Sequence, residues 1–197
     1  MKLILGSSSK FRRMVMDELD VPYEVITPDI DEKAIRDADP EKLVLAIAHA
    51  KADAILARVH ASFKEDEPTL IITADQVVVC NGEIREKPIS PAQGKEFLLA
   101  YNAAPAIIVN GMTITNMQTG MRVQGTDIMH IWYAGITDEE AETLSHDENN
   151  LVSAGGLRFE NPIMAHRMVK TDGTADASMG LPKKLLHRLL DEQNFQS

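Results

Sequence analysis

Residues 3–13, LILGSSSKFRR, join an apolar run to a glycine, three serines and, at the end, a pair of arginines. Residues 2–6 have the length and composition of a short buried strand, and the apolar residues after the serines recur at helical spacing. Serine is a favoured N-cap, so one of Ser7, Ser8 and Ser9 is expected to begin that helix. The stretch predicts the strand, turn and helix that open an α/β fold, with a helix face made of Phe11, Met14, Val15 and Leu19.

The same turn has the properties of an anion site. A helix N-terminus offers unpaired backbone N–H groups and the positive end of the helix dipole, and Lys10, Arg12 and Arg13 add cationic side chains. Neither a Walker-type phosphate loop nor the glycine pattern of a dinucleotide site is present. From this stretch alone, an ordinary helix cap and a phosphate site remain alternatives.

The rest of the chain mixes helix and strand patterns. Residues 39–63 have the most regular helical pattern, with Asp39 as N-cap and Pro40 at the first helical position. Residues 69–88 read as strands around an Asn81-Gly82 hairpin turn. These patterns predict an α/β fold with a sheet of mixed direction and flanking helices. Further elements are expected as a strand at 23–26, a helix begun by Ser90 and Pro91, two or three strands within 106–136, a helix begun by Thr137 and Glu140, strands around Leu157 and at 164–169, a turn at Asp172-Gly173 and a helix after 180–182.

Composition limits the classes of function. The 197 residues fit a single domain, 1–197, and no repeat or linker divides them. The formal net charge of -10 disfavours binding to a nucleic-acid backbone or an anionic membrane surface. One cysteine, Cys80, excludes an intrachain disulfide, and neither a secretory segment nor an apolar run of membrane-spanning length is found. We expect a cytoplasmic protein with no nucleic-acid or membrane partner.

Asp75 is the most informative acidic residue, because it stands between the apolar runs LIIT and VVV. A carboxylate is seldom buried without a partner, so a metal or catalytic role is expected for it. Glu32 lies in an acidic run typical of a solvated loop, and Lys51 and Lys87 are ordinary lysines unless an anion lies near them. Histidines at metal-ligand spacing are missing, and Cys80 has no histidine relay. The remaining carboxylates and cations fit magnesium-assisted phosphoryl chemistry.

Six short motifs, in this order, resemble those of the Maf family of nucleotide pyrophosphatases, also named for inhibition of septum formation. They are SSSKFRR, DIDE, AHAKA, TADQVV followed by NGEIREKP, SAGGLRFE and SMGLP, and together they cover nearly the whole chain. The resemblance implies hydrolysis of a nucleoside triphosphate between its α and β phosphates, giving the monophosphate and pyrophosphate. It also implies a Maf/ITPase-like fold with two lobes around a cleft, a homodimer, and Mg²⁺ or Mn²⁺ as cofactor.

The resemblance further implies a role for each matching residue. Asp75 would accept the proton of the attacking water, and Glu32 would lie near the metal and the water, so both are metal-ligand candidates. The phosphates would be held by Ser7, Arg12, Lys51 and Lys87, with Arg13 as a weaker match, since the family does not always have a basic residue there.

Three positions concern the nucleotide base. Phe11, Gln76 and Glu160 match family members that act on 7-methyl-GTP rather than on dTTP and UTP. A carboxylate can accept from guanine N1–H and its amine, and an aromatic ring can stack on a cationic methylated purine. Phe11 could equally belong to the helix core. The chain departs from the family at Lys10, where proline is usual, at YNAAPA (101–106) in place of LSG, and at GGLRFEN (155–161), which lacks a tyrosine.

Three alternatives stay open at this point. The chain could be a dTTP/UTP-type pyrophosphatase, or a relative that acts on deaminated purines such as ITP or XTP. It could also be a non-catalytic, nucleotide-binding regulator of cell division, although the complete set of acid and lysines disfavours that function.

Overall fold

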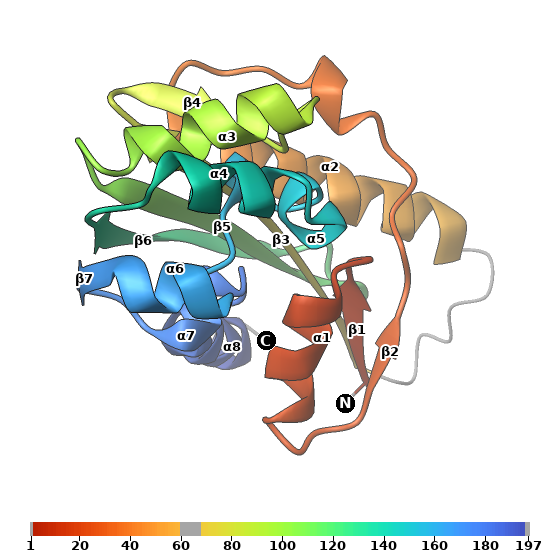
Figure 1. Ribbon diagram of the computed structural model, residues 1–197. Coiled ribbons are helices and arrows are strands. Elements are labelled where there is room, and N and C mark those ends of the chain that lie inside the picture. Colours follow the sequence, from red (N-terminus) through yellow and green to blue (C-terminus); the bar gives the residue numbers. More distant parts are fainter. Residues whose placement is uncertain (1, 60–67, 196–197) are drawn as a thin grey trace. The chain divides into compact units, whose positions relative to one another are not determined.

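The computed structural model describes residues 2–59 and 68–195. Within them, seven strands form one mixed sheet in the order β2-β1-β3-β5-β6-β7, with β4 paired to β3, and helices flank it (Figure 1). Strands β1 and β2, and β1 and β3, are parallel, whereas β3 with β4 and β6 with β7 are antiparallel. The predicted mixed α/β fold is therefore confirmed. No helix of these residues has both the length and the apolar character needed to cross a membrane.

Two compact units divide the chain. Unit 1 takes the described residues of Met1–Asp75, Asn110–Asp127 and Met179–Ser197, and unit 2 takes Gln76–Val109 and Ile128–Ser178. Unit 1 contains β1 (Lys2–Gly6), α1 (Lys10–Asp17), β2 (Tyr23–Val25), the 3-10 turn η1 (Glu32–Ala34), α2 (Pro40–Val59) and α8 (Lys183–Phe195). Unit 2 contains β4 (Glu83–Arg85), α3 (Pro91–Ala100), α4 (Asp138–Ser145), α5 (Glu148–Leu151), η3 (Ala154–Gly156), α6 (Pro162–Arg167), β7 (Met168–Thr171) and α7 (Ala175–Ser178). Both units share β3 (Thr69–Cys80), β5 (Ala106–Asn116) and β6 (Arg122–Tyr133).

Helix α1 confirms the predicted opening but shows a different buried face. Ser9 is the N-cap, since its side chain accepts a hydrogen bond from the Arg12 backbone N–H. The buried residues are Arg12, Val15 and Met16, whereas Met14 is 48% exposed. The predicted face is therefore confirmed at Val15 and at Leu19, which packs against the same core, and wrong at Met14. Polar contacts hold Arg12 inward, which the prediction did not include. Phe11 is half-buried, and the Lys10 ammonium lies 5.1 Å from its ring centroid.

Helix α2 packs closely on the sheet. Its start confirms Asp39 as N-cap, and the predicted continuation through 60–63 lies outside the described residues. Buried Thr73 of β3 donates its hydroxyl to the Ala48 carbonyl, 2.8 Å away, which fixes the register between strand and helix. On β5, a Cβ at Gly111 would lie 2.6 Å from Val44 Cγ2 and 2.8 Å from the Val44 carbonyl carbon. Glycine at this position allows α2 to approach the sheet.

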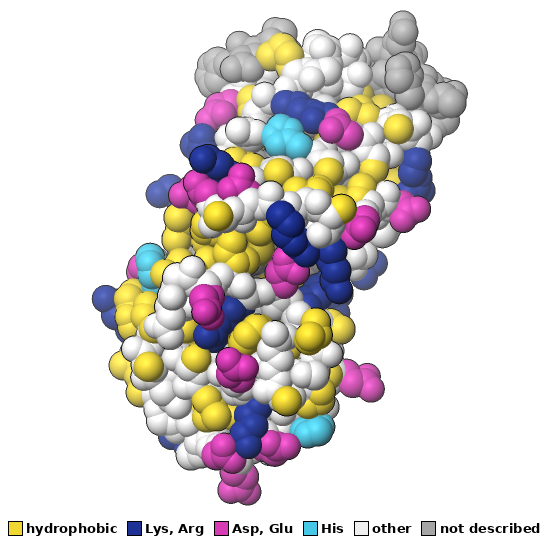
Figure 2. Space-filling view, turned by 90° about the horizontal axis from the view of Figure 1, so that it is seen from above, with side chains coloured by type: hydrophobic (Ala, Val, Ile, Leu, Met, Phe, Trp, Pro, Cys, Tyr) yellow, Lys and Arg dark blue, Asp and Glu magenta, His cyan; other side chains and the backbone are white. Residues whose placement is uncertain are grey.

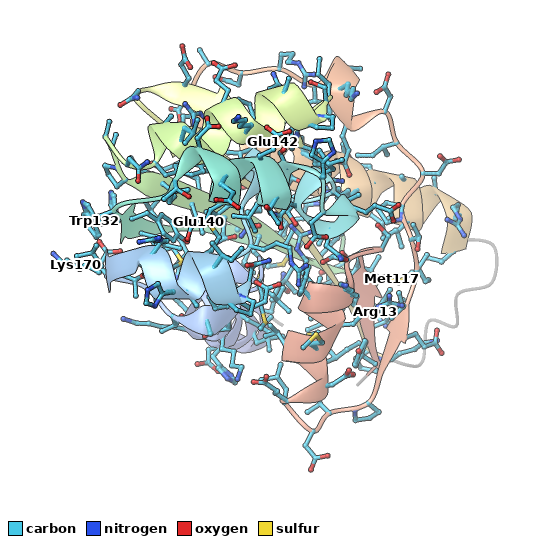
Figure 3. The ribbon with its side chains drawn as sticks, in the orientation of Figure 1. Arg13, Met117, Trp132, Glu140, Glu142 and Lys170 are labelled. Carbon is cyan, nitrogen blue, oxygen red and sulfur yellow. The ribbon has the colours of Figure 1, made fainter. Side chains whose placement is uncertain are left out.

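Unit 2 has its own core and well-capped helices. The Asn81-Gly82 hairpin is confirmed, with φ values of 54° and 78° that suit a two-residue turn. Helices α3, α4 and α5 stack together in Figure 1, and α4 begins with the predicted Thr137–Glu140 capping box. Glu140, labelled in Figure 3, also accepts from the Arg167 guanidinium at 2.8 Å, and that hydrogen bond lowers the pKa of Glu140 to about 2.

The segment after α5 differs most from the sequence prediction. The sequence predicts a strand around Leu157, but Ala154–Gly156 form a 3-10 turn and Leu157 ends it. It also predicts a strand over 164–169, but Pro162–Arg167 form helix α6, and only the last two residues of that range lie in β7. The Asn161 side chain caps α6 by accepting from the Ile163 N–H, and Pro162 occupies its first turn. This Asn-Pro pair is a helix-start pattern, and the Met, Ala and Arg residues that follow it are good helix formers.

Replacing Gly111 with alanine should push α2 away from β5. We expect Gly111→Ala to lower the free energy of unfolding by about 1–3 kcal/mol, the usual cost of overpacking, measured by urea denaturation. Gly94→Ala is the matched control. Gly94 lies inside α3, where a Cβ would be 3.6 Å from its nearest neighbouring atom, so alanine should leave stability unchanged or raise it by up to about 1 kcal/mol. Equal stability of both variants would show that the α2–β5 contact is not tight.

Candidate active site

Lys51 and Asp75 form a buried ion pair in unit 1. Lys51 is only 5% exposed on α2, Asp75 is 8% exposed on β3, and Lys51 Nζ lies 2.7 Å from Asp75 Oδ1. Asp75 therefore has the partner that its apolar surroundings require. By sequence alone, Lys51 is an ordinary surface lysine unless an anion lies near it; the structure places it in the interior beside a carboxylate.

Glu32 is the second acid of the cluster. It begins η1, and its Oε1 lies 3.0 Å from the same Lys51 ammonium, while its side chain is 47% exposed. Asp31, the neighbouring acid, caps η1 by accepting from the Lys33 N–H and stays at the surface. One ammonium thus binds a buried carboxylate and a solvent-facing one, and two of the predicted site residues are held together by a third.

Arg12 is buried in the same unit and is held by backbone carbonyls. Its Nε donates to the Gly180 carbonyl at 2.9 Å, and its Nη1 donates to the Ala74 carbonyl at 2.8 Å and to Ser7 Oγ at 3.5 Å. Burial lowers the pKa of the guanidinium, and the negative charges of Asp75 and Glu32 oppose that effect. Arg12 therefore joins the ends of three segments with a single planar group.

A break in the pairing of β3 leaves the Ala74 carbonyl as a hydrogen-bond acceptor for Arg12 and Lys51. Strand β1 pairs with Thr69–Thr73 of β3, and β4 pairs with Val78–Cys80, so residues 74–77 pair with neither strand. The Ala74 carbonyl instead accepts from Arg12 and, at 3.4 Å, from Lys51 Nζ. Ser7 directly follows β1 at this point, and its Oγ accepts from the Ser9 N–H. Ligands commonly bind at the carboxyl ends of parallel strands. Ser7 follows the end of β1, and Asp75 lies two residues past the last β3 residue that pairs with β1.

Arg13 has a different position from Arg12. It is exposed on α1, as Figure 3 shows, and its backbone carbonyl accepts from the Tyr23 hydroxyl at 3.3 Å. The structure therefore separates the two arginines of the sequence motif: only Arg12 belongs to the buried cluster. The predicted phosphate contact of Arg13 stays a prediction.

Gln76, Lys87 and Glu160 belong to unit 2. Gln76 Nε2 donates to the carbonyls of Ala177 and Ser178, at 3.2 and 3.1 Å. Lys87 is exposed in the bend after β4, and Glu160 is at the surface, where its Oε1 accepts from Arg158 Nε at 2.9 Å. Gln76 also lines a small pocket of unit 2, whose other walls include Val78, Ile108, Ala154, Leu157 and Phe159.

The chemistry of the cluster fits a hard divalent cation that takes only part of its ligands from the protein. Within residues 2–59 and 68–195, no three His, Cys, Asp or Glu side chains are placed to enclose a metal ion. Asp75 and Glu32 supply two carboxylates that meet at one ammonium. Mg²⁺ in proteins is commonly bound by one or two carboxylates together with substrate phosphates and water. The donor set therefore fits a hard divalent cation such as Mg²⁺ or Mn²⁺.

Charged side chains elsewhere are dispersed. On the face drawn in Figure 2, acidic and basic side chains alternate, and no broad basic surface forms there.

Comparison with known proteins identifies the family. The profile of the Maf family, described as Maf-like protein, matches residues 2–193. The chain belongs to the Maf family. This Maf-family chain is 40% identical over 191 residues to the 7-methyl-GTP pyrophosphatase of Dictyostelium discoideum, and the match covers 96% of each protein. It is 33% identical over 158 residues to a 7-methyl-GTP pyrophosphatase of Idiomarina loihiensis, covering 80% of this chain and 77% of that protein. It is also 29% identical over 196 residues to a dTTP/UTP pyrophosphatase of Chlamydia trachomatis, covering 98% and 95%.

Gly180 is a site residue to which the sequence alone assigns no role, although it lies within a Maf motif. Its φ of +84° is in the left-handed region, and a Cβ there would lie 3.0 Å from Arg12 Nε. Glycine thus permits the backbone carbonyl to approach the guanidinium. The SMGLP motif contains this glycine, but its partner 168 residues away could not be derived from spacing.

Removing the Lys51 cation should destabilise unit 1. In Lys51→Met, the buried Asp75 carboxylate loses its cation, so we expect the free energy of unfolding at pH 7 to fall by about 3–5 kcal/mol. The double variant Lys51→Met/Asp75→Asn should recover part of the loss, because it also removes the unpaired charge. Lys42→Met is the control on the same helix: Lys42 is 71% exposed and 3.6 Å from Asp39, so its removal should change little. Denaturant titration that gave the same loss for Lys42 and Lys51 would contradict a buried pair.

Proposed function

We propose that this Maf-family chain hydrolyses a nucleoside triphosphate between the α and β phosphates, releasing the monophosphate and pyrophosphate, and that its substrate is 7-methyl-GTP. The observation that carries the proposal is the buried Lys51–Asp75 pair, with Glu32 on the same ammonium. Two relatives named 7-methyl-GTP pyrophosphatase, at 40% and 33% identity, support the choice of substrate.

Asp75 is the proposed general base. Its Oδ1 is bound by Lys51 at 2.7 Å, which orients the carboxylate and leaves Oδ2 as the oxygen that takes the proton of the attacking water. The water would attack the α-phosphorus in line with the departing pyrophosphate. Burial of the pair keeps this carboxylate in one orientation, since a side chain at 8% exposure has little freedom.

Cationic and hydroxyl groups would hold the triphosphate. Lys51 can share its charge with a phosphate oxygen, and the Ser7 hydroxyl can donate to another, because its Oγ already accepts from Ser9 and Arg12. Arg12 Nε and Nη1 already donate to backbone carbonyls, so Arg12 would act on the phosphates mainly through its positive charge. Lys87 and Arg13 are proposed as further phosphate contacts.

Asp75 and Glu32 would hold a divalent cation, whose chemistry would be to supply positive charge beside the phosphates. Glu32 is suited to this role because its side chain faces solvent on one side and Lys51 on the other.

The base is proposed to be recognised by Phe11, Gln76 and Glu160. Gln76 lines a small pocket whose walls also include Val78, Ile108 and the aromatic Phe159. Glu160 accepts from Arg158, so a base that bonds to Glu160 would share it with that arginine. The proposed homodimer and cytoplasmic location remain predictions.

A panel of nucleotides tests the activity. The purified chain, with Mg²⁺ or Mn²⁺, is incubated with 7-methyl-GTP, GTP, UTP, dTTP, CTP and ITP, and both pyrophosphate and monophosphate are quantified. We expect the highest kcat/KM with 7-methyl-GTP. A preference for UTP and dTTP would instead indicate the activity of the pyrimidine-type relative, and nucleotide binding without any product would favour the non-catalytic regulator.

Asp75→Asn tests the general base. The amide keeps the shape and can still accept from Lys51, but it cannot take a proton, so kcat should fall by about 10²- to 10⁴-fold while nucleotide binding changes little. Asp53→Asn is the control, because Asp53 is an exposed α2 residue that pairs with Arg122. Steady-state kinetics and calorimetric titration provide the two measurements, and wild-type turnover by Asp75→Asn would exclude the assigned base.

A further inference from the structure

One buried hydroxyl in unit 2 holds the loop that lines the pocket beside Gln76. Tyr101 is the C-cap residue of α3, is 1% exposed, and donates its hydroxyl to the Gly155 carbonyl at 2.8 Å. The Gly155 N–H donates to the Glu86 carbonyl at 2.9 Å. Both backbone groups of this glycine are therefore fixed by segments that precede it by more than fifty residues in the chain.

Gly155 suits this position because the backbone φ is positive and no space is left for a side chain. Its φ is +63°, and a Cβ would lie 2.5 Å from the Tyr101 hydroxyl and 2.9 Å from Val78 Cβ. Gly156, with φ of +62°, continues the turn, and the Leu157 N–H closes it on the Ala154 carbonyl at 3.1 Å. The turn is thus pressed against Tyr101 on one side and against Val78, a pocket residue, on the other.

The turn supplies one whole wall of the pocket. Ala154, Leu157 and Phe159 line it from the loop, whereas Val78 and Ile108 line it from the strands. Strand residues are held by the sheet. The loop residues have no ladder of their own, so their position depends on the contacts that anchor Gly155.

We propose that Tyr101 is a positioning residue for base recognition: its hydroxyl holds the loop of residues 154–159, which lines the pocket beside Gln76, in one position. This inference rests on the proposed function and concerns its specificity. Tyr101 lies in YNAAPA, the segment in which this chain departs from the usual family sequence. The proposal therefore assigns a role to a residue that none of the six motifs contains.

The ring of Tyr101 has a separate role from its hydroxyl. The Arg85 guanidinium lies 5.3 Å from the ring centroid and 4.7 Å from that of Phe97, and Arg85 Nη1 donates to the Phe97 carbonyl. A phenylalanine at position 101 would keep this ring packing. It would remove the hydrogen bond to Gly155 together with the interaction of the hydroxyl with the Arg85 side chain.

Tyr133 provides a matched control. Its ring centroid lies 6.2 Å from that of Tyr101, it is buried in the same core, and its hydroxyl has no hydrogen-bond partner among the described residues. Burial raises the pKa of both phenols, so both are neutral donors at pH 7. Tyr133→Phe removes the same group without releasing the loop.

The experiment compares kcat and KM of wild type, Tyr101→Phe and Tyr133→Phe with the nucleotide that the wild type prefers and with UTP. For Tyr101→Phe we expect KM for the preferred nucleotide to rise about five- to tenfold, the factor that one buried hydrogen bond supports, with kcat nearly unchanged. KM for UTP should change less than twofold, and inhibition by pyrophosphate, which lacks a base, should stay as in the wild type. Tyr133→Phe should match the wild type throughout.

Other outcomes separate the two proposals. If wild type hydrolyses no nucleotide, the proposed function fails. If wild type is active but Tyr101→Phe keeps its selectivity, or loses kcat equally with every nucleotide, the positioning role is overturned. If Tyr101→Phe does not fold, Leu157→Ala tests the loop directly, because it removes a side chain that lines the pocket. Unchanged selectivity of Leu157→Ala would overturn the inference. A shift of its selectivity toward UTP would support the inference.

Discussion

The contact on which the site depends is the Lys51 ammonium, buried between Asp75 and Glu32. Burying either charge alone would be costly, so the lysine and the aspartate require each other. Their meeting also fixes which residue of α2 faces which residue of β3. The Thr73 hydrogen bond to Ala48 and the tight approach at Gly111 set the same register. The ion pair and the helix–sheet packing therefore both fix the position of the Asp75 carboxylate.

The interrupted ladder of β3 explains why this place is available. Between its pairing with β1 and with β4, residues 74–77 lie without either partner strand, and side-chain donors replace backbone ones at Ala74. A sheet interior offers no room for a ligand, whereas a break in it leaves a strand with its polar atoms directed outward. Asp75 and Gln76, successive residues on opposite faces of a strand, both lie in that break.

Local patterns predicted most of the fold, and long-range contacts account for what they missed. The caps at Ser9, Asp39, Ser90 and Thr137 and the Asn81-Gly82 turn depend on neighbours in sequence, so they could be derived directly. The acid at Asp75 could also be recognised, because apolar neighbours made a partner necessary. The burial of Lys51 could not, since nothing in an alanine-rich helix shows which polar residue faces a distant carboxylate. The strand predicted over 164–169 was wrong because the helix start at Asn161-Pro162 was not recognised. The hydrogen bond from Tyr101 to Gly155 joins residues 54 positions apart, so no local pattern reveals it.

The charges of the central cluster have a thermodynamic consequence. Lys51, Asp75 and Glu32 together sum to one negative charge, so the cluster by itself does not attract a triphosphate. Net attraction must come from Arg12 and other cations nearby, and from any cation that enters with the nucleotide. A cation and a nucleotide attract each other, so their binding affinities are coupled. The coupling is reciprocal: a cation that raises the affinity for the nucleotide is itself bound more tightly when the nucleotide is present. The two carboxylates proposed for the reaction therefore also couple the binding of the cation to the binding of the nucleotide.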